Sequence, residues 1–122
     1  MPGVIVASKF SADIEIDCLI IGGGAAGLTA ALAASETGVS VLVAERETRL
    51  SGSTALSSGL IPAAGTKAQG HQSIKDCEDI FYTDIMAKNK NTVEPAYVKL
   101  IVRQIPKTLD WLADDYGIPF HV

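Results

Sequence analysis

The sequence is poor in the residues that mark nucleic-acid binding. Lys and Arg together number 10, against 14 Asp and Glu, which gives a formal net charge of -4 over 122 residues. The densest basic pair is Lys88 and Lys90, and no basic cluster exists. Binding to a phosphate backbone depends on concentrated positive charge. We therefore expect no nucleic-acid partner.

Cysteine and histidine are also scarce. Cys18 and Cys77 lie far apart and fit neither a disulfide framework nor a metal-ligand spacing, while His71 and His121 are isolated. We predict no metal site and two ordinary packed thiols, as in a protein of the reducing cytoplasm. A content of 48% hydrophobic and 20% charged residues is typical of a folded globular chain.

The uncharged stretch that follows Asp17, "CLIIGGGAAGLTAALAA", has three interpretations. A membrane helix needs about 20 apolar residues without interruption, but Gly22–Gly24 break the run, and each glycine costs a helix up to about 1 kcal/mol relative to Ala. A signal peptide needs a positively charged start, whereas Asp13, Glu15 and Asp17 precede this run. The third interpretation, a turn between a strand and a helix, explains the glycines and is the one we favour.

The pattern around this turn predicts a β-α-β unit. A short β-rich run ends at Ile21, the glycines follow as Gly-x-Gly-x-x-Gly, and apolar residues then recur at helical spacing up to Ser35. Gly38 suits a helix C-terminal cap, and the β-branched run that ends in Glu45 predicts a second strand. The two strands are expected at 17–22 and 39–45.

Each part of this unit has a role in binding a dinucleotide. Gly22 allows the sharp turn, Gly24 lets the backbone approach a pyrophosphate, and Gly27 lets the helix pack closely on the sheet. The helix N-terminus offers unpaired amides and partial positive charge to phosphates. Glu45 ends the second strand, where its carboxylate accepts hydrogen bonds from ribose hydroxyls and repels a 2'-phosphate.

The segment after Glu45 distinguishes between NAD and FAD. Residues 46–70 form a long stretch rich in Gly, Ser, Thr and Ala. An NAD-binding domain returns quickly to another helix and strand, whereas a long ordered loop of this kind is usually functional. The loop favours FAD, with an NAD-binding oxidoreductase domain as the alternative.

With this loop, residues 17–65 resemble the FAD-binding part of the fumarate reductase and succinate dehydrogenase flavoprotein family, which includes ketosteroid dehydrogenases. The family pattern is GGGxAG, a strand ending in Glu, and then Gly-Gly-x-Thr/Ser-x-x-Ser-x-Gly. Here the loop reads "SGSTALSSG" over 51–59, so that Ser51 replaces the first glycine of the pattern and Ser58 stands where the family frequently has a glycine. Further on, "DWLADDYGIPF" is similar to a run of the family in which Trp-Leu is followed a few residues later by Gly-hydrophobic-x-Phe.

The resemblance implies an FAD-dependent oxidoreductase that transfers a hydride at a carbon–carbon bond next to a carbonyl or carboxylate. It implies non-covalent FAD, because the loop offers Ser and Thr where the family's flavin-linking histidine lies. The acid–base residues lie in later segments of the family, so the missing C-terminal part is the expected partner and no catalytic residue is assigned. The residues implied in cofactor binding are Gly22, Gly24, Ala25, Ala26, Gly27, Glu45, Arg46, Gly52, Ser53, Thr54, Ser58 and Gly59.

The remainder, 73–122, is predicted to be helical. Ser73–Asp76 matches a capping box, and the helix that it starts is expected to bury Ile74, Cys77, Ile80, Phe81 and Met86. A second helix is expected from Pro95, interrupted or restarted at Pro106. It should end at Gly117 and be followed by a short strand near 119–122.

The fold class is therefore α/β. We expect an incomplete Rossmann-like FAD-binding unit over 1–72, followed by a helical segment over 73–122 that begins the remainder of a larger flavoprotein. A non-catalytic nucleotide-binding or interaction module stays open as a further alternative, because no catalytic residue set is recognised.

Overall fold

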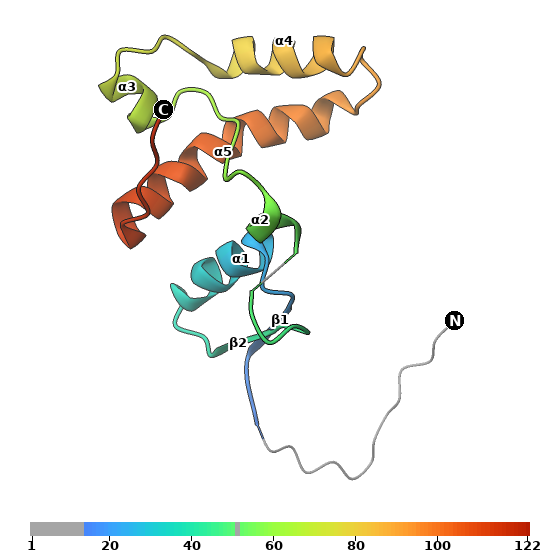
Figure 1. The fold of residues 1–122 in the computed structure, drawn as a ribbon, viewed down its shortest axis with the longest axis vertical. Helices are drawn as coiled ribbons and strands as arrows, with labels where there is room; N and C mark the ends of the chain where they lie inside the picture. Colours follow the sequence, from blue (N-terminus) through green and yellow to red (C-terminus); the bar gives the residue numbers. More distant parts are fainter. Residues whose placement is uncertain (1–13, 51) are drawn as a thin grey trace. The chain divides into compact units, whose positions relative to one another are not determined.

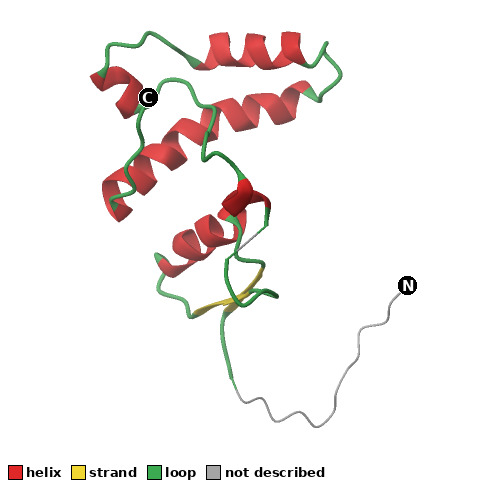
Figure 2. Ribbon diagram, in the orientation of Figure 1, coloured by secondary structure: helices red, strands yellow, loops and turns green. Residues whose placement is uncertain are grey.

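The computed structural model describes residues 14–50 and 52–122. Ser51 and the first 13 residues of the predicted FAD-binding unit lie outside the described residues. The chain divides into two compact units, with the boundary between Leu60 and Ile61. Figures 1 and 2 show the elements of each unit. The functional boundary at 72/73 stays a prediction.

The first unit is a β-α-β unit, as predicted. Strand β1 (Cys18–Ile21) leads into helix α1 (Ala25–Ser35), which is followed by strand β2 (Val41–Ala44). The two strands lie side by side (Figure 2). They pair in parallel, in a register that runs from Cys18 opposite Val41 to Ile21 opposite Ala44. Both strands are shorter than the predicted spans, because pairing is limited to these four positions.

Helix α1 covers one face of this two-stranded sheet. The side chain of Ile20 approaches the helix at Gly27, and Cys18, Val41 and Val43 are half-buried with it. Side chains alternate along a strand, so the opposite face carries the exposed side chains of Leu19, Ile21 and Leu42. A doubly wound parallel sheet has helices on both faces. The structure thus agrees with an incomplete Rossmann-like domain.

A one-turn helix that the sequence did not predict lies in the loop after β2. Helix α2 (Ser53–Leu56) follows Gly52, whose φ of 89° lies in the left-handed region. Every described residue of this loop, from 52 to 60, is exposed. The Ser/Thr-rich segment is therefore structured locally, by backbone geometry rather than by burial.

The second unit is helical and consists of α3 (Lys67–His71), α4 (Glu78–Lys88) and α5 (Pro95–Tyr116). Helices α4 and α5 run antiparallel, joined by a short turn (Figure 1). Their core consists of Met86, Val98 and Val102, with partly buried side chains around it from Phe81, Tyr82, Ile85 and Val93. The prediction that a helical segment follows the β-α-β unit is confirmed.

The prediction of a helix start at Ser73 was wrong. Ser73 has a φ of 60°, and its amide donates to the carbonyl of Gly70 in the turn that ends α3. The capping box lies instead at Thr66, whose hydroxyl accepts from the amide of Gln69 while the Gln69 side chain accepts from the Thr66 amide. Helix α4 begins later, with Cys77 as its N-cap.

Because α4 starts later, its predicted buried side was only partly right. Met86 is buried and Phe81 is partly buried, but Ile74, Cys77 and Ile80 are exposed. Ile74 and Cys77 precede the helix and so cannot belong to its apolar face.

Helix α5 also differs from the prediction at its middle and after its end. It runs without a break through Pro106, which is itself buried. Gly117 ends it in the left-handed conformation, with a φ of 65°, as predicted. Within the described part of the chain, residues 119–122 form no strand, so that expectation was wrong. No helix among the described residues is both long and apolar enough to cross a membrane.

Candidate functional site

The glycine turn between β1 and α1 is a close-packed backbone structure. Gly22 has a φ of 101°, and its amide donates to the carbonyl of Ala44 at 2.8 Å. A Cβ on Gly27 would lie 2.0 Å from the Gly22 carbonyl oxygen. Gly22 is needed for its left-handed conformation and Gly27 for this contact. Both are structural requirements of the turn itself.

Gly24 differs from these two glycines. It is the N-cap residue of α1, with φ −77° and ψ 177°, a conformation that any residue adopts. A Cβ there would meet only the Thr54 Oγ1 atom, at 3.6 Å, which is ordinary van der Waals contact. The protein's own packing therefore does not require glycine at this position. A side chain there would occupy the space at the N-terminus of α1.

Glu45 lies directly after β2 and reaches the glycine turn. Its Oε2 atom accepts a hydrogen bond from the Gly23 amide at 2.7 Å, and its Oε1 atom accepts from the Glu47 amide at 3.0 Å. The Glu47 amide, and then that of Gly23, hold the pKa of Glu45 below its ordinary value. The structure thus brings together the glycine turn and the acid that the sequence predicted as a pair, and the acid is ionised at neutral pH.

Gly23 and Leu50 are site residues that the sequence reasoning missed. Gly23 is buried, and a Cβ on it would lie 2.4 Å from the Cδ2 atom of Leu50 and 3.2 Å from the Oε2 atom of Glu45. The signal for Gly23 was present, because it is the middle glycine of three. Nothing in the local pattern marks Leu50, since its contact with the turn is a tertiary one.

The Ser/Thr loop reaches the turn through Thr54. Its Oγ1 atom accepts a hydrogen bond from the amide of Ala25, the first residue of α1, at 3.2 Å. Ser57 forms hydrogen bonds within the loop, to the Thr54 carbonyl and from the Gly59 amide. Gly52 and Gly59 both have positive φ values. Ser53 and Ser58 are exposed on this loop, and their predicted cofactor contacts stay predictions.

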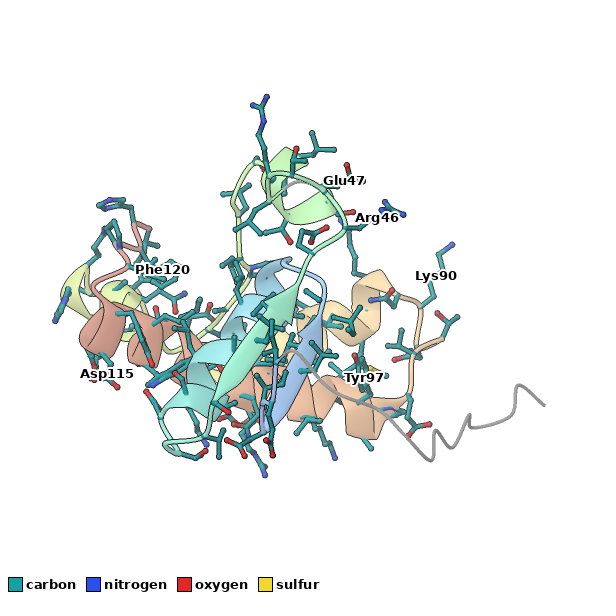
Figure 3. The ribbon with its side chains drawn as sticks, turned by 90° about the horizontal axis from the view of Figure 1, so that it is seen from below. Arg46, Glu47, Lys90, Tyr97, Asp115 and Phe120 are labelled. Atoms are coloured by element: carbon teal, nitrogen blue, oxygen red, sulfur yellow. The ribbon has the colours of Figure 1, made fainter. Side chains whose placement is uncertain are left out.

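Arg46 is exposed on the loop that follows β2. Figure 3 shows Arg46 and Glu47 on the loop that follows β2, and the Nε atom of Arg46 lies 3.1 Å from the Oε1 atom of Glu47. The Arg46 side chain is 91% exposed. The side chain is therefore largely in solvent, and its predicted role in cofactor binding stays a prediction.

This arrangement is suited to binding an anion next to a hydroxylated group. The first amides of a helix have no intrahelical acceptors, and the residues at this end of α1 are Ala25, Ala26 and Gly27. The N-cap Gly24 supplies no side-chain cap, and the Ala25 amide donates to Thr54, so a phosphate is a natural acceptor for the amides of Ala26 and Gly27. Within the described ranges, 14–50 and 52–122, no group of three His, Cys, Asp or Glu side chains forms a metal site.

Comparison with known proteins gives consistent matches. A family model described as an FAD binding domain matches residues 17–122. NADH:fumarate oxidoreductase of Klebsiella pneumoniae (strain 342) is 34% identical over 98 residues, which are 80% of this chain and 11% of that protein. The acrylate reductase flavoprotein subunit of Shewanella woodyi is 30% identical over 110 residues, 89% of this chain and 22% of that protein.

A solved structure, the open conformation of a flavocytochrome c3 fumarate reductase, matches with a TM-score of 0.72 and 28% sequence identity. The match covers 80% of this chain and 17% of that one. The chain thus spans about a tenth to a fifth of the length of these proteins.

Proposed function

Because this chain belongs to the FAD-binding domain family, we propose that it is the cofactor-binding part of a reductase that acts on the C=C bond of an unsaturated carboxylate. The expected resemblance to fumarate reductase flavoproteins is confirmed by the family match and by the relatives. Two relatives carry the names of fumarate and acrylate reductases, whose substrates are both carboxylates conjugated to a C=C bond. The activity belongs to a protein much longer than this stretch, because the chain covers only a small share of each relative.

The pyrophosphate-binding role of the glycine turn is supported above all by Gly24, where no side chain is present. The packing of the protein itself does not require a glycine at this position. The missing side chain is instead explained by the close approach of a pyrophosphate to the N-terminus of α1. In this proposal Gly22, Gly24, Ala25, Ala26 and Gly27 form the pyrophosphate site. FAD, when bound, supplies the hydride acceptor and donor of the reaction.

Glu45 is proposed to hold the adenosine ribose. Each of its carboxylate oxygens accepts one backbone amide, and a carboxylate oxygen has a second lone pair with which to accept a ribose hydroxyl. Its lowered pKa keeps it ionised, so that it accepts hydrogen bonds and disfavours a 2'-phosphate. Arg46 is proposed to lie near the adenine, and Gly52, Ser53, Thr54, Ser58 and Gly59 to follow the ribityl chain and the flavin.

Three further properties are part of the proposal. FAD is bound non-covalently, since the loop offers hydroxyls rather than a histidine. The protein works in the cytoplasm, in keeping with two cysteines that are free thiols. The remainder of the flavoprotein supplies the acid–base residues and the substrate pocket.

The test uses the full-length protein. It is expected to be yellow as purified and to release FAD on acid denaturation, and its chemically reduced flavin should be reoxidised by fumarate or acrylate. Succinate, which lacks the C=C bond, serves as the control and should leave the flavin reduced. A colourless protein that is stabilised thermally by NAD and not by FAD would contradict the proposal in favour of an NAD domain. A protein that responds to neither cofactor would favour a non-catalytic module.

A further inference from the structure

Thr54 caps helix α1 from outside the helix. Its Oγ1 atom accepts the amide of Ala25 at 3.2 Å, although the two residues are 29 positions apart in the sequence. The same oxygen lies 3.6 Å from the position of a Cβ on Gly24. The amide of the first helical residue has no acceptor within the helix. A residue of the Ser/Thr loop therefore supplies the acceptor that the N-cap, Gly24, lacks.

The other polar bonds of this loop are local. The Leu56 amide donates to the Gly52 carbonyl, the Ser57 hydroxyl donates to the Thr54 carbonyl, and the Gly59 amide donates to the Ser57 hydroxyl. Among the described residues 52–59, the hydrogen bond that connects the loop to the β-α-β unit is the one made by Thr54. The loop is exposed along its described length, so burial does little to hold it. The hydrogen bond that links the described loop to α1 thus comes from one hydroxyl.

We propose that Thr54 is a positioning residue that holds the 52–59 loop against the first turn of α1, so that the helix amides and the loop hydroxyls form one preformed surface toward the cofactor. The identity of the ligand rests on the proposed function, whereas the holding role does not. The chemistry suits a hydroxyl, because its oxygen accepts from Ala25 while its own hydrogen stays available to donate to an anion. A valine has the same shape and does neither.

The first measurement is hydrogen exchange at the Ala25 amide in the full-length protein after removal of cofactor. Thr54→Val should raise the exchange rate of this amide by about three- to tenfold, the effect of losing one neutral hydrogen bond. Thr54→Ser keeps the hydroxyl and should restore the wild-type rate. The matched control is Thr37→Val, which removes a hydroxyl that donates to the Ala34 carbonyl at the opposite end of α1 and should leave Ala25 unchanged. If T54V fails to fold, Thr54→Ala takes its place.

The second measurement is FAD affinity of the same variants, by quenching of flavin fluorescence. T54V should raise the dissociation constant for FAD by at least the factor by which it raises the exchange rate of the Ala25 amide. T54S should restore the wild-type affinity, and T37V should leave the affinity unchanged. Unchanged exchange at Ala25 in T54V overturns the positioning role. Faster exchange with wild-type FAD affinity overturns the claim that the held surface serves the cofactor. Faster exchange in a protein whose wild-type form takes up no FAD supports the positioning role and refutes the proposed function, so the two failures are distinguishable.

Discussion

Two alanine substitutions, only three residues apart in the glycine turn, should have opposite effects. Gly24→Ala places a methyl group 3.6 Å from its nearest neighbour, the Oγ1 atom of Thr54, in a backbone conformation that alanine adopts freely. Gly27→Ala places the same methyl group 2.0 Å from the Gly22 carbonyl oxygen, which is backbone and cannot rotate away. The first change should affect ligand binding, and the second should affect folding.

The magnitudes follow from these contacts. Replacing glycine by alanine at an unstrained position stabilises a protein by about 0.4–1 kcal/mol, because the unfolded chain loses freedom. The free energy of unfolding of cofactor-free G24A should therefore equal or slightly exceed that of wild type. Overpacking costs typically about 1–3 kcal/mol and occasionally more, and G27A should lie at or above the upper end because the helix must move off the sheet. FAD affinity in G24A should fall by about tenfold or more, since the backbone can no longer approach a phosphate closely.

The assay is urea unfolding of the full-length protein with and without FAD, together with an FAD titration of each variant. G24A should unfold like wild type without FAD and gain less stability when FAD is added. G27A should be destabilised under both conditions. The reasoning is refuted if cofactor-free G24A is as unstable as G27A, or if G24A binds FAD as tightly as wild type.

Three other predictions concern side chains around the turn and in the second unit. Gly23→Ala should cost much less stability than G27A, because the new methyl group meets the Cδ2 atom of Leu50, the end of an exposed side chain that can rotate away. A loss of unfolding free energy in G23A as large as that in G27A would refute this prediction. Because the pKa of Glu45 is lowered in the folded state, its carboxylate should stabilise the fold at neutral pH and lose that contribution as the pH falls below about 4. In a plot of the unfolding midpoint against pH, E45Q should therefore fall less steeply than wild type on the acid side, and an unchanged slope would contradict this prediction. The pKa of Lys67 is raised, mainly by Asp114, so this pair should stabilise the second unit at neutral pH and lose its effect as the pH rises through that raised pKa. D114N should weaken both the alkaline dependence and the sensitivity to salt, and an identical alkaline limb in D114N would count against the pair.

The sequence was sufficient for the β-α-β unit because several local signals agreed there. The β-branched run before Glu45, the glycine spacing and the helical period each predict the same element at the same place. The pairing of Glu45 with the glycine turn also followed, since the ends of neighbouring parallel strands lie at one edge of a sheet. Local signals of this kind need no knowledge of what packs where.

The errors in the second unit come from local signals that compete. Ser73–Asp76 and Thr66–Gln69 both match a capping-box pattern, and the structure uses the second, where Gln69 is buried with its amide nitrogen donating to the Ala63 carbonyl. Pro106 lacks an amide, which predicts an interruption, yet α5 continues because the burial of Pro106 and Val102 outweighs one missing hydrogen bond. The prediction of a strand near 119–122 was wrong because a strand forms only when it pairs with another strand, and the local sequence does not show whether such a partner is present.

The contacts of Thr54 and Leu50 could not be predicted from local sequence patterns, because they too are tertiary contacts. Each joins the glycine turn to a segment more than 20 residues away, and neither residue type is distinctive where it stands. The family pattern placed Thr54 in the cofactor loop but gave no reason for its bond to Ala25.

The bare side of the two-stranded sheet, where Leu19 is 54% and Ile21 is 77% exposed, has a practical consequence for affinity measurements. A peptide cut around the turn would spend part of its time unfolded, since a two-stranded sheet covered on one side is marginal in water. Its apparent dissociation constant would then be the intrinsic one divided by the folded fraction. Weak FAD binding by such a peptide would therefore reflect its small folded fraction, and not a low intrinsic affinity of the folded turn.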